Sequence, residues 1–119
     1  MNKIHDAVAG LRRVPGVRGA AVVTRDGLIA ASALDGGVGA DVVAGLTSYL
    51  MMAANKGLAE GEMGHCGRLT VTATNGKAVF VDLGEACLVV LFDQFADVGA
   101  GRKDIDAAAD NIRRLSRLS

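Results

Sequence analysis

The chain has few aromatic residues and no excess of basic ones. It contains no tryptophan, one tyrosine and three phenylalanines, and its 13 basic residues are balanced by 13 acidic ones. Nucleic-acid-binding proteins gain affinity by neutralising phosphates with Lys and Arg, and single-strand binders stack bases on aromatic rings. The chain has little of either, so its composition argues against nucleic-acid binding.

Cysteine is scarce too, and long apolar stretches are lacking. The two cysteines, Cys66 and Cys87, lie far apart, and the longest apolar run covers only residues 86–92. A membrane-spanning helix needs about 20 apolar residues. Residues 1–16 carry charges throughout, unlike a secretory signal peptide. We therefore expect a cytoplasmic protein with reduced thiols and no membrane insertion.

Half of the residues are hydrophobic, which is enough for the core of one domain spanning residues 1–119. Apolar periodicity predicts helices at residues 2–13, 41–59 and 102–118, and strands at residues 17–24, 28–33, 68–74, 77–83 and 86–92. The only proline, Pro15, ends the first helix. The dipeptides Asp26-Gly27 and Asn75-Gly76 mark hairpin turns, and the second predicts a type I′ turn.

This element order, α-β-β-α-β-β-β-α, predicts an α+β fold with a five-stranded antiparallel sheet. Residues 86–92 are apolar on both faces, so we place them in the central strand. Strands that are apolar on both faces need helices on both sides of the sheet. We expect the middle helix on one face and the two terminal helices on the other.

The middle helix, residues 41–59, is unusual on both of its sides. Val42, Val43, Leu46, Thr47, Tyr49, Leu50, Met51, Ala53, Ala54 and Leu58 fill about half of a wheel drawn at 100° per residue. The side chains of the other arc are mostly small or weakly polar, where a solvated face would usually carry Glu and Lys. We predict that this arc meets a second chain through Gly45, Ser48, Met52, Asn55 and Lys56.

The strand at residues 68–74 is predicted to lie at one edge of the sheet, and residues 28–33 at the other. Edge strands usually carry a proline or an inward-pointing charge, which discourages pairing with another chain. Neither is found in the strand at residues 68–74. Its alternating residues Arg68, Thr70 and Thr72 complete the predicted dimer or partner interface.

No set of residues predicts a catalytic, cofactor or metal site. His65-Cys66, with Glu60 and Glu62 nearby in the glycine-rich segment 57–67, lacks a second Cys/His pair at zinc spacing. Cys87 lies inside an apolar strand, which favours core packing over reactivity. We expect a protein that is not an enzyme and binds no cofactor.

The sequence resembles the Roadblock/dynein light chain family along nearly its whole length. The resemblance rests on VPGVRGAAVV at residues 14–23, DGLIAAS at residues 26–32 and LGEACLVVL at residues 83–91, followed by Val98-Gly99 and Arg102. It implies a profilin/longin-like sheet between helices, and a homodimer made by pairing an edge strand and juxtaposing the middle helices. Bacterial members of the MglB type act on small Ras-like GTPases without inserting a catalytic residue.

Two functions follow as hypotheses. The first is a homodimeric regulator or scaffold that binds a small Ras-like GTPase. The sequence leaves open which GTPase is bound, and whether its hydrolysis is accelerated or its nucleotide state only sensed. It also leaves open which arc of the middle helix meets the twin subunit and which meets the GTPase. The second is a small-molecule sensor with a pocket between helix and sheet, for which the polar candidates are Thr47, Tyr49 and Thr72.

Overall fold

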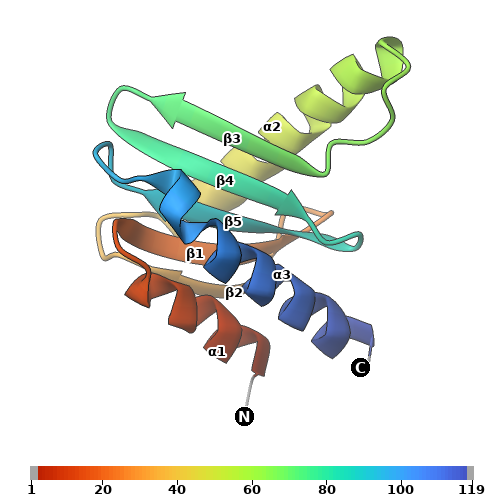
Figure 1. The fold of residues 1–119 in the computed structure, drawn as a ribbon. Coiled ribbons are helices and arrows are strands. Elements are labelled where there is room, and N and C mark those ends of the chain that lie inside the picture. The colour runs from red at the N-terminus through yellow and green to blue at the C-terminus, as the bar shows by residue number, and fades with distance from the viewer. Residues whose placement is uncertain (1–2, 118–119) are drawn as a thin grey trace.

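A computed structural model describes residues 3–117 and shows an α+β fold in three layers (Figure 1). The elements are α1 (Lys3–Gly10), the 3-10 helix η1 (Leu11–Arg13), β1 (Val17–Thr24), β2 (Ile29–Leu34), α2 (Ala40–Glu60), β3 (Arg68–Ala73), β4 (Gly76–Asp82), β5 (Ala86–Phe92), the 3-10 helix η2 (Val98–Gly101) and α3 (Arg102–Arg117). The predicted order of helices and strands is confirmed. Residues 2 and 118, which the predicted terminal helices included, lie outside the described part of the chain.

The five strands form one antiparallel sheet in the order β2-β1-β5-β4-β3. The apolar run of β5 lies at the centre as predicted, and Leu88, Val89 and Val90 are fully buried. β2 and β3 are the two edges, also as predicted. The central position explains why β5 carries no polar side chain, because helices cover both of its faces.

Helices α1 and α3 cover one face of the sheet, and α2 crosses the other (Figure 1). On the first face, Val8 of α1 packs with Ile105 and Ile112 of α3 in one core cluster. On the second face, Val43 and Ala44 of α2 pack over a separate cluster of strand side chains. The C-terminal turns of α2 project beyond the edge strand β3 (Figure 1).

Local geometry differs from the prediction at one turn and in one pair of strands. The β3–β4 hairpin pairs Ala73 with Gly76, so Thr74 and Asn75 form the turn. Neither Asn75 nor Gly76 has a positive φ, so the predicted type I′ turn is wrong. Gly27 does have a positive φ of 83°, in agreement with the Asp-Gly turn signal. The β1–β2 pairing skips Ala30 in a bulge, which the sequence pattern did not reveal.

Of the helices that the structure describes, none is long and apolar enough to cross a membrane. The long helix α2 begins after Gly39 and runs to Glu60, one residue beyond the predicted helix at each end. The loop that leads from it to β3 therefore starts at Gly61.

Candidate functional site: the outer face and flanks of the middle helix

Only a narrow sector of α2 faces the sheet. Val43, Ala44 and Thr47 are its buried residues. The Thr47 hydroxyl donates a hydrogen bond of 2.7 Å to the carbonyl oxygen of Val43, which satisfies this buried polar group within the helix. Leu50 and Met51 are half-buried at the border of this sector.

The side of α2 that points away from the sheet is apolar and exposed. Val42, Leu46, Tyr49 and Met52 are 71%, 44%, 64% and 65% exposed, and their spacing places them along one stripe of the helix. We call these four residues the α2 stripe. The prediction placed Val42, Leu46 and Tyr49, together with Ala53, on the apolar half of the helix, which was expected to face the sheet. In the structure these four residues are exposed, so this placement is wrong. A helical wheel shows the angle of each residue around the helix axis. It does not show which apolar residues face the core and which face outward.

A groove of about 700 Å³ runs along one flank of α2, and we call it the α2 groove. Its helix wall includes Gly45, Ser48, Met52 and Asn55, which are four of the five α2 residues predicted to meet a second chain. The opposite wall comes from the β1–β2 and β4–β5 turns. The groove is lined by Val23, Thr24, Arg25, Gly45, Thr47, Ser48, Tyr49, Met51, Met52, Asn55, His65, Asp82, Gly84, Ala86 and Cys87.

Hydrogen bonds within the protein hold three polar side chains of this groove, those of Arg25, Asp82 and Asn55. The Arg25 Nε donates to the carbonyl oxygen of Gly84 at 2.7 Å, and the Gly84 N–H donates to Asp82 Oδ1 at 3.0 Å. The first bond joins the β1–β2 turn to the β4–β5 turn, and the second lies within the β4–β5 turn. The Cys66 N–H donates to Asn55 Oδ1 at 2.7 Å, which ties the loop before β3 to α2. The walls are therefore held in place without a ligand.

Cys87 lies at the floor of the α2 groove and is buried. The pKa of the Cys87 thiol is raised from 9.0 to about 12. The main cause is burial, and the second is the nearby Asp82 carboxylate. A thiol with this pKa stays protonated at neutral pH and is a poor nucleophile. The groove therefore offers an apolar thiol and no reactive thiolate at Cys87.

A second groove, of about 440 Å³, lies on the opposite flank of α2, and we call it the edge groove. Leu46 and Leu50 form its helix side, and Val71 and Phe80 are among its strand residues. It is lined by Arg18, Val38, Leu46, Leu50, Val71, Ala73, Thr74, Asn75, Gly76, Lys77, Ala78, Phe80, Leu91 and Phe92. It therefore lies at the end of β3 and opens beside that edge strand.

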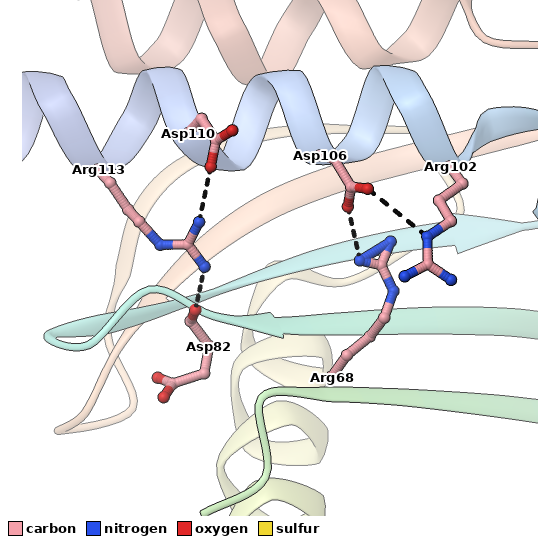
Figure 2. A network of polar contacts seen from close by, with 6 residues as sticks. All are labelled: Arg68, Asp82, Arg102, Asp106, Asp110 and Arg113. Carbon is pink, nitrogen blue, oxygen red and sulfur yellow. Dashed lines mark hydrogen bonds and ion pairs between the residues drawn. The ribbon is translucent and has the colours of Figure 1, made fainter.

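The structure does not bring all eight predicted interface residues together. Lys56 is exposed on α2 outside the α2 groove. Thr70 pairs with Val79, whose side chain belongs to the α1 and α3 cluster, so Thr70 faces away from α2. Arg68 and Thr72 share that face by alternation, and Thr70 and Thr72 are exposed. Arg68 is held by Asp106 of α3 (Figure 2).

Of the three polar residues proposed for a small-molecule sensor, Thr47 and Tyr49 line the α2 groove and Thr72 does not. Thr47 lines the α2 groove, but its hydroxyl is bonded to its own helix. Tyr49 is mostly exposed, and Thr72 is on the other face of the sheet. Glu60, Glu62 and His65 are exposed, whereas Cys66 is buried. Among residues 3–117, no three His, Cys, Asp or Glu side chains are grouped so that they could hold a metal ion.

Comparison with known proteins identifies relatives in sequence and in fold. The Roadblock/LC7 domain family matches residues 3–92. An uncharacterized protein of Methanocaldococcus jannaschii is 37% identical over 105 residues, which cover 88% of this chain and 92% of the relative.

Solved structures extend this likeness to the whole fold. Myxococcus xanthus MglB superposes with a TM-score of 0.91 at 18% identity, covering 100% of this chain and 98% of that protein. A Roadblock/LC7 domain from Streptomyces avermitilis has a TM-score of 0.85 at 24% identity, covering 95% and 97%. At these identities, the structural likeness concerns the fold.

Proposed function

Because the chain belongs to the Roadblock/LC7 domain family, we propose that it acts as a homodimer that binds and regulates a small Ras-like GTPase without a catalytic residue of its own. The observation that carries the proposal is the exposed α2 stripe. Burial of a large apolar side chain contributes roughly 1.5–3 kcal/mol. Four such side chains along one stripe of a helix are typical of a surface that a partner covers.

The dimer contact begins at the edge strand β3. Residues 69–73, the sequence LTVTA, contain no charge and no proline to oppose pairing with a second chain. Two copies of β3 that pair in antiparallel orientation about a twofold axis would extend the sheet across both subunits. Arg68, Thr70 and Thr72 would then lie at this seam, on the face that α3 covers.

Antiparallel pairing also determines where α2 of each subunit goes. The C-terminal part of α2 lies at the start of β3, because Asn55 of α2 holds the backbone of Cys66. The edge groove lies at the other end of β3, beside Val71 and Ala73. In an antiparallel pair, the start of one β3 meets the end of the other. The projecting C-terminal turns of α2 would therefore enter the edge groove of the partner.

Side-chain sizes along this flank of α2 fit such a contact. Leu46 and Leu50 line the edge groove near the N-terminal half of the helix. Ala53 and Gly57 follow on the same flank and are small, and both are exposed. A Cβ added at Gly57 would meet nothing within 4 Å. Two antiparallel copies of α2 would place the large residues of each helix against the small residues of the other.

The opposite flank stays free in this dimer, and we assign it to the GTPase. Gly45, Ser48, Met52 and Asn55 form the helix wall of the α2 groove on that flank. Met52 belongs both to the groove and to the α2 stripe, so it gives a partner an apolar anchor next to polar walls. Lys56 would lie between the two contacts, on the outer face of the helix.

The alternative function is a small-molecule sensor that uses the α2 groove. Its polar groups Arg25, Asp82 and Asn55 already have partners within the protein, which favours a protein ligand over a small molecule. Thermal denaturation with nucleotides and metabolites discriminates the two functions. A large shift with a small ligand, and no binding of any GTPase, would favour the sensor.

The direct test is binding of the small Ras-like GTPases encoded in the same genome, each loaded with GDP or with a non-hydrolysable GTP analogue. We expect one of them to bind the wild type, and Met52→Glu to weaken binding at least about tenfold because it adds a charge at a desolvated contact. Phe95→Ser, which changes an exposed apolar residue outside both grooves, is the matched control and should bind like the wild type. Equal binding by Met52→Glu and the wild type would contradict the placement.

A further inference from the structure

Among residues 3–117, the most exposed large apolar side chain lies far from α2 in the sequence and on a different segment. Phe95, in the connection between β5 and η2, is 86% exposed. Its backbone is held firmly, because the Phe95 N–H donates to Asp93 Oδ1 at 2.8 Å and the Ala96 N–H donates to the Asp93 carbonyl at 3.2 Å. The turn therefore holds the backbone of Phe95 in place and leaves its aromatic ring exposed to solvent.

The rest of the chain anchors this turn from two sides. The Asp93 N–H donates to the carbonyl oxygen of Gly16 at 2.9 Å, and the Lys77 ammonium donates to the carbonyl oxygen of Ala96 at 2.7 Å. A rigid aromatic anchor loses little conformational entropy when a partner binds it. The exposure of Phe95 is thus built into the fold.

A cleft of about 350 Å³ opens beside Phe95, and we call it the Phe95 cleft. Val14 and Pro15 form one side, and Ala100 and Gly101 are among its small residues. At Val14 and Pro15 the cleft adjoins a second groove of about 470 Å³ between α1 and α3. The two hollows share Val14 and Pro15 in their walls, so they adjoin on the surface.

The cleft has an acidic rim. Asp93 and Asp97 line it, and each accepts a backbone hydrogen bond through Oδ1. Asp104 lines the adjoining groove, where Arg13 is the lining cation. Among the ion pairs of residues 3–117, none involves these three carboxylates. Lys77, whose ammonium donates to the carbonyl oxygen of Ala96, does not line the cleft.

We propose that Phe95 and its cleft form a second docking site, which takes an extended segment of a partner protein. An apolar side chain of that segment enters the cleft against Phe95 and Pro15, and a neighbouring Lys or Arg meets Asp93 and Asp97. The acidic rim is what selects this occupant. The adjoining groove lies between α1 and α3, which cover the sheet face opposite α2, so the site does not depend on the function proposed for α2 and would let one dimer connect two partners.

The test is a selection of displayed random dodecapeptides on the immobilised full-length protein, followed by affinity measurements with the enriched peptides. We expect enriched sequences to combine an apolar or aromatic residue with a nearby Lys or Arg. Phe95→Ser should weaken their binding at least about tenfold, because it removes the central anchor. Asp97→Asn, which keeps an oxygen to cap η2, should weaken binding and reduce its dependence on salt. Met52→Glu, on the other face, should leave the peptide affinity unchanged.

Several outcomes overturn the proposal. They are a failure to enrich any peptide over the bare support, enriched peptides without basic residues, and equal binding by Phe95→Ser and the wild type. Loss of peptide binding in Met52→Glu would place the peptides on α2 instead. A lower molar mass of Phe95→Ser in solution would show that the cleft holds a second copy of this chain, which also overturns it.

Discussion

The Nη1 atom of Arg68 lies 2.8 Å from Oδ1 of Asp106, which joins the edge strand β3 to helix α3 (Figure 2). Arg102 approaches the other oxygen of Asp106 at 3.6 Å. The Arg68 side chain is only 25% exposed, so part of its charge is removed from water. This contact holds the strand that we propose as the dimer seam against the rest of the subunit.

Asp106→Asn should lower the free energy of unfolding by about 0.5–1 kcal/mol, because Arg68 loses a charged partner at a half-exposed site. The matched control is Asp110→Asn, which breaks the ion pair between Asp110 and Arg113 on one exposed surface of α3 (Figure 2). That change should cost less, roughly 0.2–0.5 kcal/mol. Urea denaturation of the wild type and the two variants measures these free energies of unfolding. Equal losses in the two variants would show that partial burial of Arg68 does not strengthen its ion pair with Asp106.

Gly16→Ala should be far more destabilising than an ordinary surface substitution. Gly16 has a φ of 84°, and a Cβ there would lie 2.4 Å from the Cβ of Ala96. Backbone strain and overlap together should cost about 2 kcal/mol or more. Gly36→Ala is the control, because Gly36 has no positive φ and its Cβ would meet nothing within 4 Å. Thermal melting should show a lower midpoint for the first variant only.

Cys87 should make stability depend on pH in alkaline solution. Its pKa is about 12 in the folded protein and 9.0 in the ordinary state, so the unfolded chain loses the thiol proton first as the pH rises. The folded state then binds more protons, and its stability falls between about pH 9 and 12. Between pH 8 and 10 the wild type should lose about 1 kcal/mol more than Cys87→Ala. Parallel pH profiles of the two proteins would contradict the buried, protonated thiol.

The sequence predicted the fold well because its hydrophobic periods are clear and its turns are marked. The apolar run at residues 86–92 and the alternation in β3 sufficed to assign the centre and one edge of the sheet. The turn at Thr74 and Asn75 was predicted wrongly, because the Asn-Gly dipeptide only favours a type I′ turn. The register of the two strands decides which residues form the turn. The bulge at Ala30 left no signal at all.

The candidate site was predicted less completely, for a physical reason. Gly45, Ser48, Met52 and Asn55 were proposed as contact residues because weakly polar residues are unusual on an outer arc, and the structure places all four along one groove. Val42, Leu46 and Tyr49 were placed on the sheet-facing half, because an apolar residue type does not by itself tell whether the side chain faces the core or the outside. The exposure of Phe95 depends on how its turn is bonded to Gly16 and Lys77, contacts between distant parts of the chain.

The measurement that tests the central claim most directly is the molar mass of three proteins in solution, determined by light scattering at micromolar concentration. The wild type and Met52→Glu should be dimers, because Met52 lies on the flank assigned to the GTPase. Leu46→Glu should be a folded monomer, because Leu46 lies on the flank assigned to the second subunit and is 44% exposed in one chain. A monomeric wild type, or a Leu46→Glu variant that remains a dimer, would contradict the account.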